Sequence, residues 1–305
     1  MNSSQPSHFT LSGYFDVGLL KYLCFVLLLC LYLLIIGANL LLILVICVNR
    51  TLHEPMYLFL LSLFVNELYG SSCMFPLLLV QVLSDSHTVS VPLCLLQIYL
   101  LYSYSGVELF NLAAMSYDRY VAICCPLHYH RAMTSRRAVV LIALAWLLPV
   151  PLCVIMVCMS SSLQLCGNII HKVYCDNYLV VRLSCHDTRP INVYGLLLNS
   201  TVISTTVVLI FYSYSRIISV CVWSSAETRQ KALSTCSPQM ASLINFTCGS
   251  SFELLSSRFD LDGIPEVLRV LLSLYWLLCQ PLFNPCMYGL KMSRVRLACR
   301  KLLST

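Results

Sequence analysis

The chain has 305 residues, of which 59% are hydrophobic and only 10% are charged, and its formal net charge is +6. Soluble domains carry about 25% charged residues, so this chain has too few polar groups to cover a surface that faces water. The composition therefore excludes an ordinary soluble domain and indicates a protein dissolved in lipid. The positive charge follows the membrane topology described below and does not indicate binding of nucleic acid.

Long apolar runs along the chain predict membrane-spanning helices. A spanning helix needs ~20 mostly apolar residues, and in hydrocarbon only helices or closed barrels satisfy every backbone group. The runs are continuous rather than alternating, which favours helices. We predict an all-α bundle in a single domain, 1–305, followed at the end of the bundle by a short interfacial helix. The seven predicted spans are about 20–48, 56–83, 92–124, 137–158, 191–221, 232–257 and 265–290.

Lysine and arginine in the short loops predict the orientation of the spans. The loops after the first, third and fifth spans and the tail 291–305 hold most of these residues, whereas the opposite loops mix basic with acidic side chains. We expect the basic loops and the tail in the cytoplasm. The N-terminal segment 1–19 and the long loop 159–190 then lie outside. Asn2 begins an Asn-Ser-Ser sequon in that outer segment, so it is the predicted glycosylation site.

Four cysteines on the outer side predict two disulfide bonds. Cys94 stands at the start of the third span, and Cys166, Cys175 and Cys185 lie in the loop 159–190. Disulfides persist in the oxidising compartment that this side faces, and a loop of that length needs bridges to be ordered. Four cysteines allow three pairings. Of these we predict Cys94 with Cys175 and Cys166 with Cys185.

Polar side chains near the middle of four spans predict a buried polar cluster. They are Asn39, Glu67, Glu108 and Asn284. An ionised group at the centre of a bilayer costs ~2.5–3.5 kcal/mol, so each is a candidate functional residue. A Na⁺ ion or a shared proton would keep the two carboxylates compatible. The alternative is that both acids are neutral and only pack. We expect no other cofactor.

Asp118 and Arg119 stand together at the inner end of the third span, ten residues beyond Glu108. That separation corresponds to ~15 Å along a helix axis. The acid can hold Arg119 while the site is unoccupied, and Tyr214 or Tyr288 can replace the acid as its partner. Such an exchange predicts a two-state switch.

Helical spacing on the sixth span, together with residues of the third and fifth, predicts a ligand pocket in the outer half of the bundle. Apolar walls with a few polar groups are typical of sites for small ligands. The predicted lining residues are Leu101, Tyr102, Ser105, Asn199, Val202, Thr247, Ser250, Ser251, Leu254 and Arg258.

Arg258 has two interpretations at the outer end of the sixth span. Its guanidinium matches the fork of a carboxylate, which predicts an acidic ligand. Alternatively, Arg258 is solvated and pairs with Asp260 or Asp262. Glu253, five residues earlier, is expected on a different face, where it contacts an amine or another helix. An amino acid would suit the pocket if both charges met one ligand.

Six motifs follow one another along the chain: GAN (37–39), LHEPMYLFL (52–60), MSYDRYVAIC (115–124), SYSRI (213–217), KALSTCSPQM (231–240) and PLFNPCMY (281–288). In this order they resemble those of rhodopsin-like G-protein-coupled receptors, and within them the odorant receptors. The outer cysteines also fit the family's pattern. NELYGSS (66–72) and FNLAAMSYDRY (110–120) are more similar to fish receptors for water-borne odorants.

Three positions depart from the family's pattern. Glu67 replaces an Asp of the second helix, Gln239, preceded by Pro238, replaces a His of the sixth, and Thr247 replaces a Tyr. The first change conserves charge, whereas the others place the usual contacts of the sixth helix in question.

The resemblance implies a plasma-membrane receptor in the cilia of olfactory neurons. A small water-soluble odorant would bind at the outer side, the inner end of the sixth helix would shift outward, and a stimulatory olfactory G protein would raise cAMP. Membrane lipids would contact the interfacial helix. The implied switch residues are Asp118, Arg119, Tyr120, Tyr214, Asn284, Pro285 and Tyr288.

Other classes of protein fit the sequence less well. A transporter would show inverted repeats or broken helix pairs in matching halves, and the sequence has no such repeat. An enzyme would need a catalytic motif, and neither HExxH nor GxSxG occurs. A non-olfactory receptor for a small metabolite stays open as an alternative.

Overall fold

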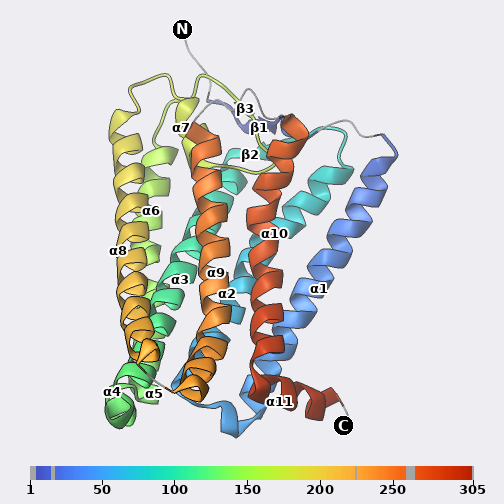
Figure 1. The fold of residues 1–305 in the computed structure, drawn as a ribbon. Helices are drawn as coiled ribbons and strands as arrows, with labels where there is room; N and C mark the ends of the chain where they lie inside the picture. The colour runs from blue at the N-terminus through green and yellow to red at the C-terminus, as the bar shows by residue number, and fades with distance from the viewer. Residues whose placement is uncertain (1–4, 15–17, 224, 259–264, 304–305) are drawn as a thin grey trace.

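The computed structural model describes residues 5–14, 18–223, 225–258 and 265–303. Long helices lie side by side in a bundle (Figure 1). They are α1 (Leu20–Val48), α2 (Pro55–Leu83), α3 (Val91–Cys124), α5 (Ser135–Leu147), α6 (Pro149–Ser161), α8 (Arg189–Val222), α9 (Ala226–Arg258) and α10 (Glu266–Lys291). With α5 and α6 together forming the fourth member, the predicted all-α bundle of seven helices is confirmed.

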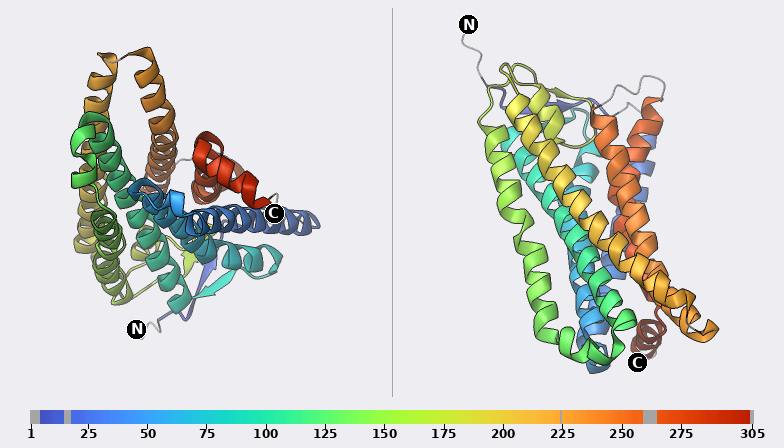
Figure 2. Two further views of the ribbon diagram at one scale, coloured as in Figure 1. Left: turned by 90° about the horizontal axis from the view of Figure 1, so that it is seen from below. Right: turned by 60° about the vertical axis from the view of Figure 1, so that its left-hand side comes forward.

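Short elements mark the two ends of the bundle. The sheet end, at the top of Figure 1, carries β1 (His8–Leu11), β2 (Thr88–Ser90), β3 (Ile169–Ile170) and α7 (Asn177–Arg182). The opposite end, which we call the α11 end, carries η1 (Arg50–Leu52), η2 (Pro126–His128), α4 (Tyr129–Ala132) and α11 (Ser293–Leu303). Seen from below in Figure 2, α11 leaves α10 and lies across the end of α1, which it contacts.

The fourth span and α9 differ from an uninterrupted apolar helix. The fourth span is divided at Leu148, because Pro149 and Pro151 have no backbone N–H to continue the helical hydrogen bonds. In the described part of the chain, six helical segments are long and apolar enough to cross a membrane. The equally long α9 is not among them, because Ser, Thr and charged residues recur along it. It continues through Pro238 without a break in the assigned helix.

A small sheet, which the sequence did not predict, closes the sheet end. Its strand order is β2-β1-β3, with Phe9 of β1 opposite Val89 of β2 in an antiparallel pair and Leu11 beside Ile170 in a parallel pair. These side chains are buried together against Ile98 of α3. The N-terminal segment and the loop before α7 are thereby held over the end of the bundle.

Glycines allow two close approaches between helices near the middle of the bundle. A Cβ atom on Gly70 of α2 would lie 2.5 Å from the ring of Tyr104 on α3. A Cβ atom on Gly106 of α3 would lie 2.7 Å from the ring of Pro149 on α6. Both distances are far shorter than a carbon–carbon contact, so α2 and α6 reach α3 only because these positions lack a side chain.

Apolar side chains cover the outward surface of the bundle. Leu27 and Leu33 on α1, and Val208 and Phe211 on α8, are each at least 60% exposed. Soluble monomers rarely expose contiguous apolar surface of this kind. The same surface is stable in hydrocarbon, which agrees with a protein that spans a membrane.

Candidate ligand pocket and switch residues

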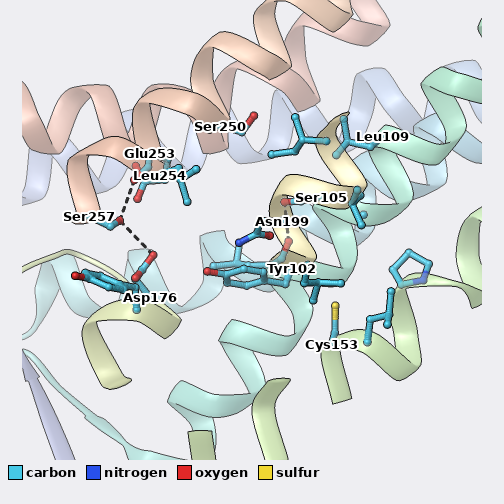
Figure 3. Close-up of a pocket in the computed structure, with 18 of the residues that line it drawn as sticks. Tyr102, Ser105, Leu109, Cys153, Asp176, Asn199, Ser250, Glu253, Leu254 and Ser257 are labelled. Atoms are coloured by element: carbon cyan, nitrogen blue, oxygen red, sulfur yellow. Dashed lines mark hydrogen bonds between the residues drawn. The ribbon is translucent and has the colours of Figure 1, made fainter. Parts of the chain in front are cut away.

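A cavity lies between α3, α6, α8 and α9, beneath the segment that precedes α7 (Figure 3). Its volume is about 140 Å³. An engineered apolar cavity of ~150 Å³ binds benzene, so this space suits a small organic molecule. Most of its wall is apolar and includes Leu109, Phe110, Leu152, Phe246 and Leu254. Its charged lining residues come from the sheet end, which we call the polar end of the cavity: Asp176 directly precedes α7, and Glu253 and Arg258 are near the end of α9.

Eight of the ten residues predicted from helical spacing line this cavity. They are Leu101, Tyr102, Ser105, Asn199, Val202, Ser250, Leu254 and Arg258. Figure 3 shows Tyr102, Asn199 and Ser250 approaching the space from three different helices.

Thr247 and Ser251 are corrections to that prediction, since neither lines the cavity. Thr247 turns its hydroxyl back to the carbonyl oxygen of Leu243, 2.7 Å away, and Ser251 is exposed. Contacts of α9 with α3 and α10 set its rotation, so the face that meets the cavity includes Phe246, Ser250 and Glu253. The helical period used for the prediction was right, but the face of α9 that it assigned to the cavity was not.

Glu253 is a second correction, because it lines the same cavity as Arg258 despite the offset of five residues. Its Oε1 accepts hydrogen bonds from Lys172 Nζ and from the Tyr174 hydroxyl. Lys172 also contacts Asp176 Oδ2 at 3.5 Å. These residues join the loop before α7 to α9, and we call Lys172, Tyr174, Asp176 and Glu253 the loop cluster.

The charges of the loop cluster keep Lys172 and Tyr174 protonated. Burial alone would lower the pKa of Lys172, but the carboxylates of Asp176 and Glu253 outweigh it and raise that pKa above its usual value. Burial, followed by the same two carboxylates, raises the pKa of Tyr174 well above its usual value. Lys172 therefore stays cationic and Tyr174 stays protonated around neutral pH, so that both donate to Glu253.

Arg258 lies at the same end of the cavity. Its guanidinium carbon is 4.7 Å from the centre of the Tyr178 ring, which is a cation–π arrangement. Its Nε is buried and has no hydrogen-bond partner within the described part of the chain. Asp260 and Asp262, the alternative partners considered from the sequence, lie outside the described residues.

A buried polar network lies deeper in the bundle, around Glu67 and Glu108. Asn284 Nδ2 donates to Glu67 Oε1 and, at 3.1 Å, to Glu108 Oε1. Asn66 Nδ2 donates to Glu108 Oε2 at 2.9 Å, and the Tyr104 hydroxyl donates to Glu67 Oε2 at 3.0 Å. The two carboxylates therefore share one amide and join α2, α3 and α10.

Asn39 is a correction to the predicted cluster. It is buried, but its Nδ2 donates to the carbonyl oxygens of Ile35 and Pro281, both at 2.9 Å, rather than to a carboxylate. Asn39 therefore links α1 to α10 beside the network. The backbone of Pro281 is available as an acceptor because residue 285 is also proline and has no N–H to donate to it.

At the α11 end, Asp118 is buried and holds Arg119. Arg119 donates to Asp118 Oδ2 through Nε, at 3.1 Å, and through Nη2. The Tyr129 hydroxyl donates to Asp118 Oδ1 at 2.9 Å. The hydroxyls of Tyr214 and Tyr288 are buried, and neither has a hydrogen-bond partner among the residues that the structure describes.

A small cavity at this end is lined by Asp118, Arg119, Gln239 and Tyr288, among others. Gln239 donates to the carbonyl oxygen of Leu112 at 2.9 Å, so α9 contacts α3 here although the family's His is absent. Tyr120 packs near Tyr212, with ring centres 6.1 Å apart.

Both predicted disulfide pairings are present. Cys94 is bonded to Cys175, and Cys166 to Cys185, with Cα–Cα distances of 5.5 and 5.2 Å. The backbone N–H of Cys175 also donates to Gln97 Oε1 at 2.9 Å. The loop that covers the cavity is thus anchored to α3. Asn2 lies outside the described residues.

Sequence reasoning missed several partners in these sites. Asn66 and Tyr104 carried a usable signal: Asn66 is adjacent to Glu67, and Tyr104 lies four residues before Glu108, on the same face of a helix. Lys172 and Asp176 carried none, because an isolated charged residue in an outer loop is usually solvated.

Comparison with known proteins agrees with this architecture. The family model described as "Olfactory receptor" matches residues 28–305. Human Olfactory receptor 11A1 is 35% identical over 97% of this chain and 94% of its own length. Human Olfactory receptor 6N1 is 35% identical over 99% of this chain and 96% of its own, and mouse Olfactory receptor 4B13 is 33% identical over 98% and 97%.

These relatives are signalling receptors rather than enzymes, and they are multi-pass proteins of the plasma membrane. The match spans nearly the whole chain and includes all the long helices of the bundle except the beginning of α1. The chain belongs to the olfactory receptor family of G-protein-coupled receptors.

Proposed function

We propose that this receptor binds a small, water-soluble odorant in the cavity between α3, α6, α8 and α9 and activates a stimulatory olfactory G protein, which raises cAMP. One observation carries the proposal: the single helix α3 contributes Tyr102 to the cavity and Asp118 with Arg119 to the opposite end. From Tyr102 to Arg119 the helix rises ~25 Å. A change at the cavity thus has a continuous mechanical route to the acid–base pair.

The orientation is part of this proposal. The sheet end would face outside, where disulfides persist, and the α11 end with its basic residues would face the cytoplasm. Arg294 of α11 pairs with Glu54 at 2.9 Å, and Val295 is buried among residues of the bundle. The exposed Arg300 can then contact anionic lipid headgroups. Cilia are the proposed location, and the likeness to fish receptors stays a prediction.

The proposed function is tested by a cAMP screen in cells that supply the olfactory G protein. Carboxylic acids, amines, amino acids, bile salts and neutral odorants are applied to the full-length receptor, with Arg119→Ala as the coupling-deficient control. We expect at least one class to raise cAMP in the wild type and not in the variant. A response carried only by a different G protein would favour the alternative of a receptor for a non-olfactory metabolite.

Tyr129→Phe should raise basal cAMP several-fold. The change removes the hydrogen bond that Tyr129 donates to Asp118 and leaves the shape of the side chain otherwise intact. A hydrogen bond to a charged group contributes ~1.5–3 kcal/mol, and ~1.4 kcal/mol changes an equilibrium tenfold. Asp118 would hold Arg119 less firmly, so Tyr214 or Tyr288 would compete more often for Arg119. Basal cAMP is measured at matched surface expression.

Tyr22→Phe is the matched control, because Tyr22 is 56% exposed at the sheet end of α1. It should leave basal cAMP unchanged. If Tyr129→Phe reaches the surface normally and signals at the wild-type basal level, Asp118 does not restrain Arg119 in the resting receptor.

For the polar network, we propose that a shared proton or a Na⁺ ion compensates Glu67 and Glu108. Among the described residues, the side chains that donate hydrogen bonds to the two carboxylates are neutral amides and a hydroxyl, so the carboxylates have no cationic partner there. Carboxylate oxygens are the ligands that a hard cation such as Na⁺ prefers. Ligand affinity should depend on Na⁺ or pH in the wild type and lose that dependence in Glu67→Gln and Glu108→Gln. If the ligand affinity of the wild type changed with neither Na⁺ concentration nor pH, neither a Na⁺ ion nor a shared proton would compensate the two carboxylates.

A further inference from the structure

Two lining residues of the ligand cavity, Glu253 and Arg258, each have one buried polar atom that lacks a hydrogen-bond partner among the described residues. Among the buried polar atoms that lack a hydrogen bond in the described residues, Glu253 Oε2 and Arg258 Nε are the ones that belong to lining residues of this cavity. An unsatisfied buried polar group costs ~1–3 kcal/mol, and more when it is charged. Each atom therefore gains if a ligand supplies the missing partner: a donor for Glu253 and an acceptor for Arg258.

Within the described residues, the charged side chains around the cavity also leave one negative and one positive group without a partner of their own. In the loop cluster, one ammonium, that of Lys172, serves the two carboxylates of Asp176 and Glu253. Arg258 is contacted by the ring of Tyr178, and the ion pairs of the described residues include none to its guanidinium. One side of the polar end thus has an excess negative charge and the other an excess positive charge.

We propose that the cavity binds a zwitterionic amino acid with an apolar side chain, its ammonium held by Glu253 and its carboxylate by Arg258. Signalling by this ligand rests on the proposed function, whereas its binding does not. A zwitterion is neutral overall. It matches a site in which the charges of four side chains sum to zero, namely those of Lys172, Asp176, Glu253 and Arg258. A simple amine would leave Arg258 without an acceptor, and a simple acid would leave Glu253 Oε2 without a donor.

The remaining wall of the cavity fits the rest of such a molecule. Leu109, Phe110, Phe246 and Leu254 give the cavity apolar wall surface. Burying an aliphatic or aromatic side chain among them contributes about 25 cal/mol per Å² of apolar surface removed from water. Apolar amino acids should therefore bind more tightly than glycine, which has no side chain to bury.

The guanidinium of Arg258 is well suited to the carboxylate. It presents donors in a planar fork that binds both oxygens at once, and contact with Tyr178 fixes its plane. Glu253 and Arg258 are five residues apart, which is ~7.5 Å of helix rise. Both residues line one small cavity, so a ligand that contacts both needs its two charged groups close together, as they are in an α-amino acid.

Binding is tested on the purified full-length receptor by thermal unfolding and ligand titration. The probes are L-leucine, L-methionine and L-phenylalanine, each compared with the molecule that lacks its amino group and the molecule that lacks its carboxylate. For L-leucine these are 4-methylpentanoate and 3-methylbutylamine, which are smaller and meet no new steric barrier. We expect at least one amino acid to bind at least tenfold more tightly than both of its fragments.

Two variants assign the charged contacts. Glu253→Gln keeps an acceptor for Lys172 and Tyr174 but removes the negative charge. In this variant the amino acid should no longer bind more tightly than the fragment that lacks the amino group. Arg258→Gln should abolish the advantage that the carboxylate confers. Arg189→Gln is the matched control, because the Arg189 side chain is 90% exposed, and it should change neither. The ligand comparison on the wild type tests the proposal even if a variant fails to fold.

The two readouts separate this inference from the proposed function. Tight binding of an amino acid without any rise in cAMP would support the binding site and contradict coupling to the olfactory G protein. If none of the three amino acids binds better than its fragments, while a neutral odorant raises cAMP, the zwitterion site is wrong and the receptor function stands. If both variants lost affinity equally for the amino acids and for their fragments, the assignment of the two contacts would also be wrong.

Discussion

The double substitution Cys94→Ser/Cys175→Ser should remove the receptor from the cell surface. The bond between these cysteines spans 81 residues of sequence. In the chain-entropy model, closing a loop of that length stabilises the folded state by ~4.5 kcal/mol. Folded proteins are stable by only ~5–15 kcal/mol, so the loss consumes a large part of the total. Replacing both cysteines avoids leaving a lone thiol that could form a wrong bond.

The structure adds a second reason for a large effect. Cys175 lies within the segment that contains Tyr174 and Asp176, and all three line the ligand cavity. Without the disulfide, this segment keeps the hydrogen bond from Cys175 to Gln97 and the contacts of the loop cluster, but it has no covalent cross-link to α3. We therefore expect loss of ligand response even in any fraction that reaches the surface.

Surface labelling and thermal unfolding measure the effect, with two comparisons. Cys166→Ser/Cys185→Ser breaks a bond that spans 19 residues, for which the same model predicts ~3 kcal/mol and a smaller loss. Cys24→Ser alters a free, exposed cysteine and should behave as the wild type. Normal surface expression and ligand response in the Cys94/Cys175 variant would show that this bond is dispensable.

Asn284→Ala should be the most damaging single change inside the helices. Asn284 is fully buried, donates to Glu67 and Glu108, and accepts a hydrogen bond from Ser242 at 2.6 Å. The substitution leaves two buried carboxylates with fewer donors and leaves a hydroxyl without its acceptor. Each orphaned group costs ~1–3 kcal/mol, and charged ones cost more. A total of several kcal/mol would lower the unfolding temperature by more than about 5 °C.

Asn192→Ala provides the control for this prediction. Asn192 is half-buried near the start of α8 and donates to the Thr188 hydroxyl at 3.1 Å. Water can reach this half-buried position and replace the lost hydrogen bond, so the unfolding temperature should hardly change. A further variant, Asn284→Asp, would place a third carboxylate beside the other two and should be at least as harmful as the alanine. A mild effect of Asn284→Ala would mean that water or an ion replaces the amide.

Much of the architecture could be predicted because it depends on local quantities. The length and polarity of each apolar run determine whether it can span a membrane, which is why the predicted spans lie close to the observed helices. The fourth span shows the limit of this argument. Its hydropathy does not reveal the division at Leu148, although the adjacent Pro149 and Pro151 are visible in the sequence.

The ligand cavity was predicted less completely, and α9 shows why. A period of 3.6 residues identifies sets of residues that share a face, but it does not say which set turns inward when polar residues occur all round the helix. In α9, Ser and Thr occupy several faces. Packing against α3 and α10 decides the rotation, and with it the placement of Glu253 in the cavity and of Ser251 outside it.

By itself the sequence determined the number of helices, the residues that carry charge in their interior, the four bridging cysteines and the Asp118–Arg119 pair. Only the tertiary structure decided that Lys172 reaches Glu253, that Asn284 is shared by Glu67 and Glu108, and that three short strands close one end. The physical reason is distance along the chain. Burial in lipid is a property of each segment, whereas a hydrogen bond between residues 81 or 217 positions apart depends on how whole helices pack.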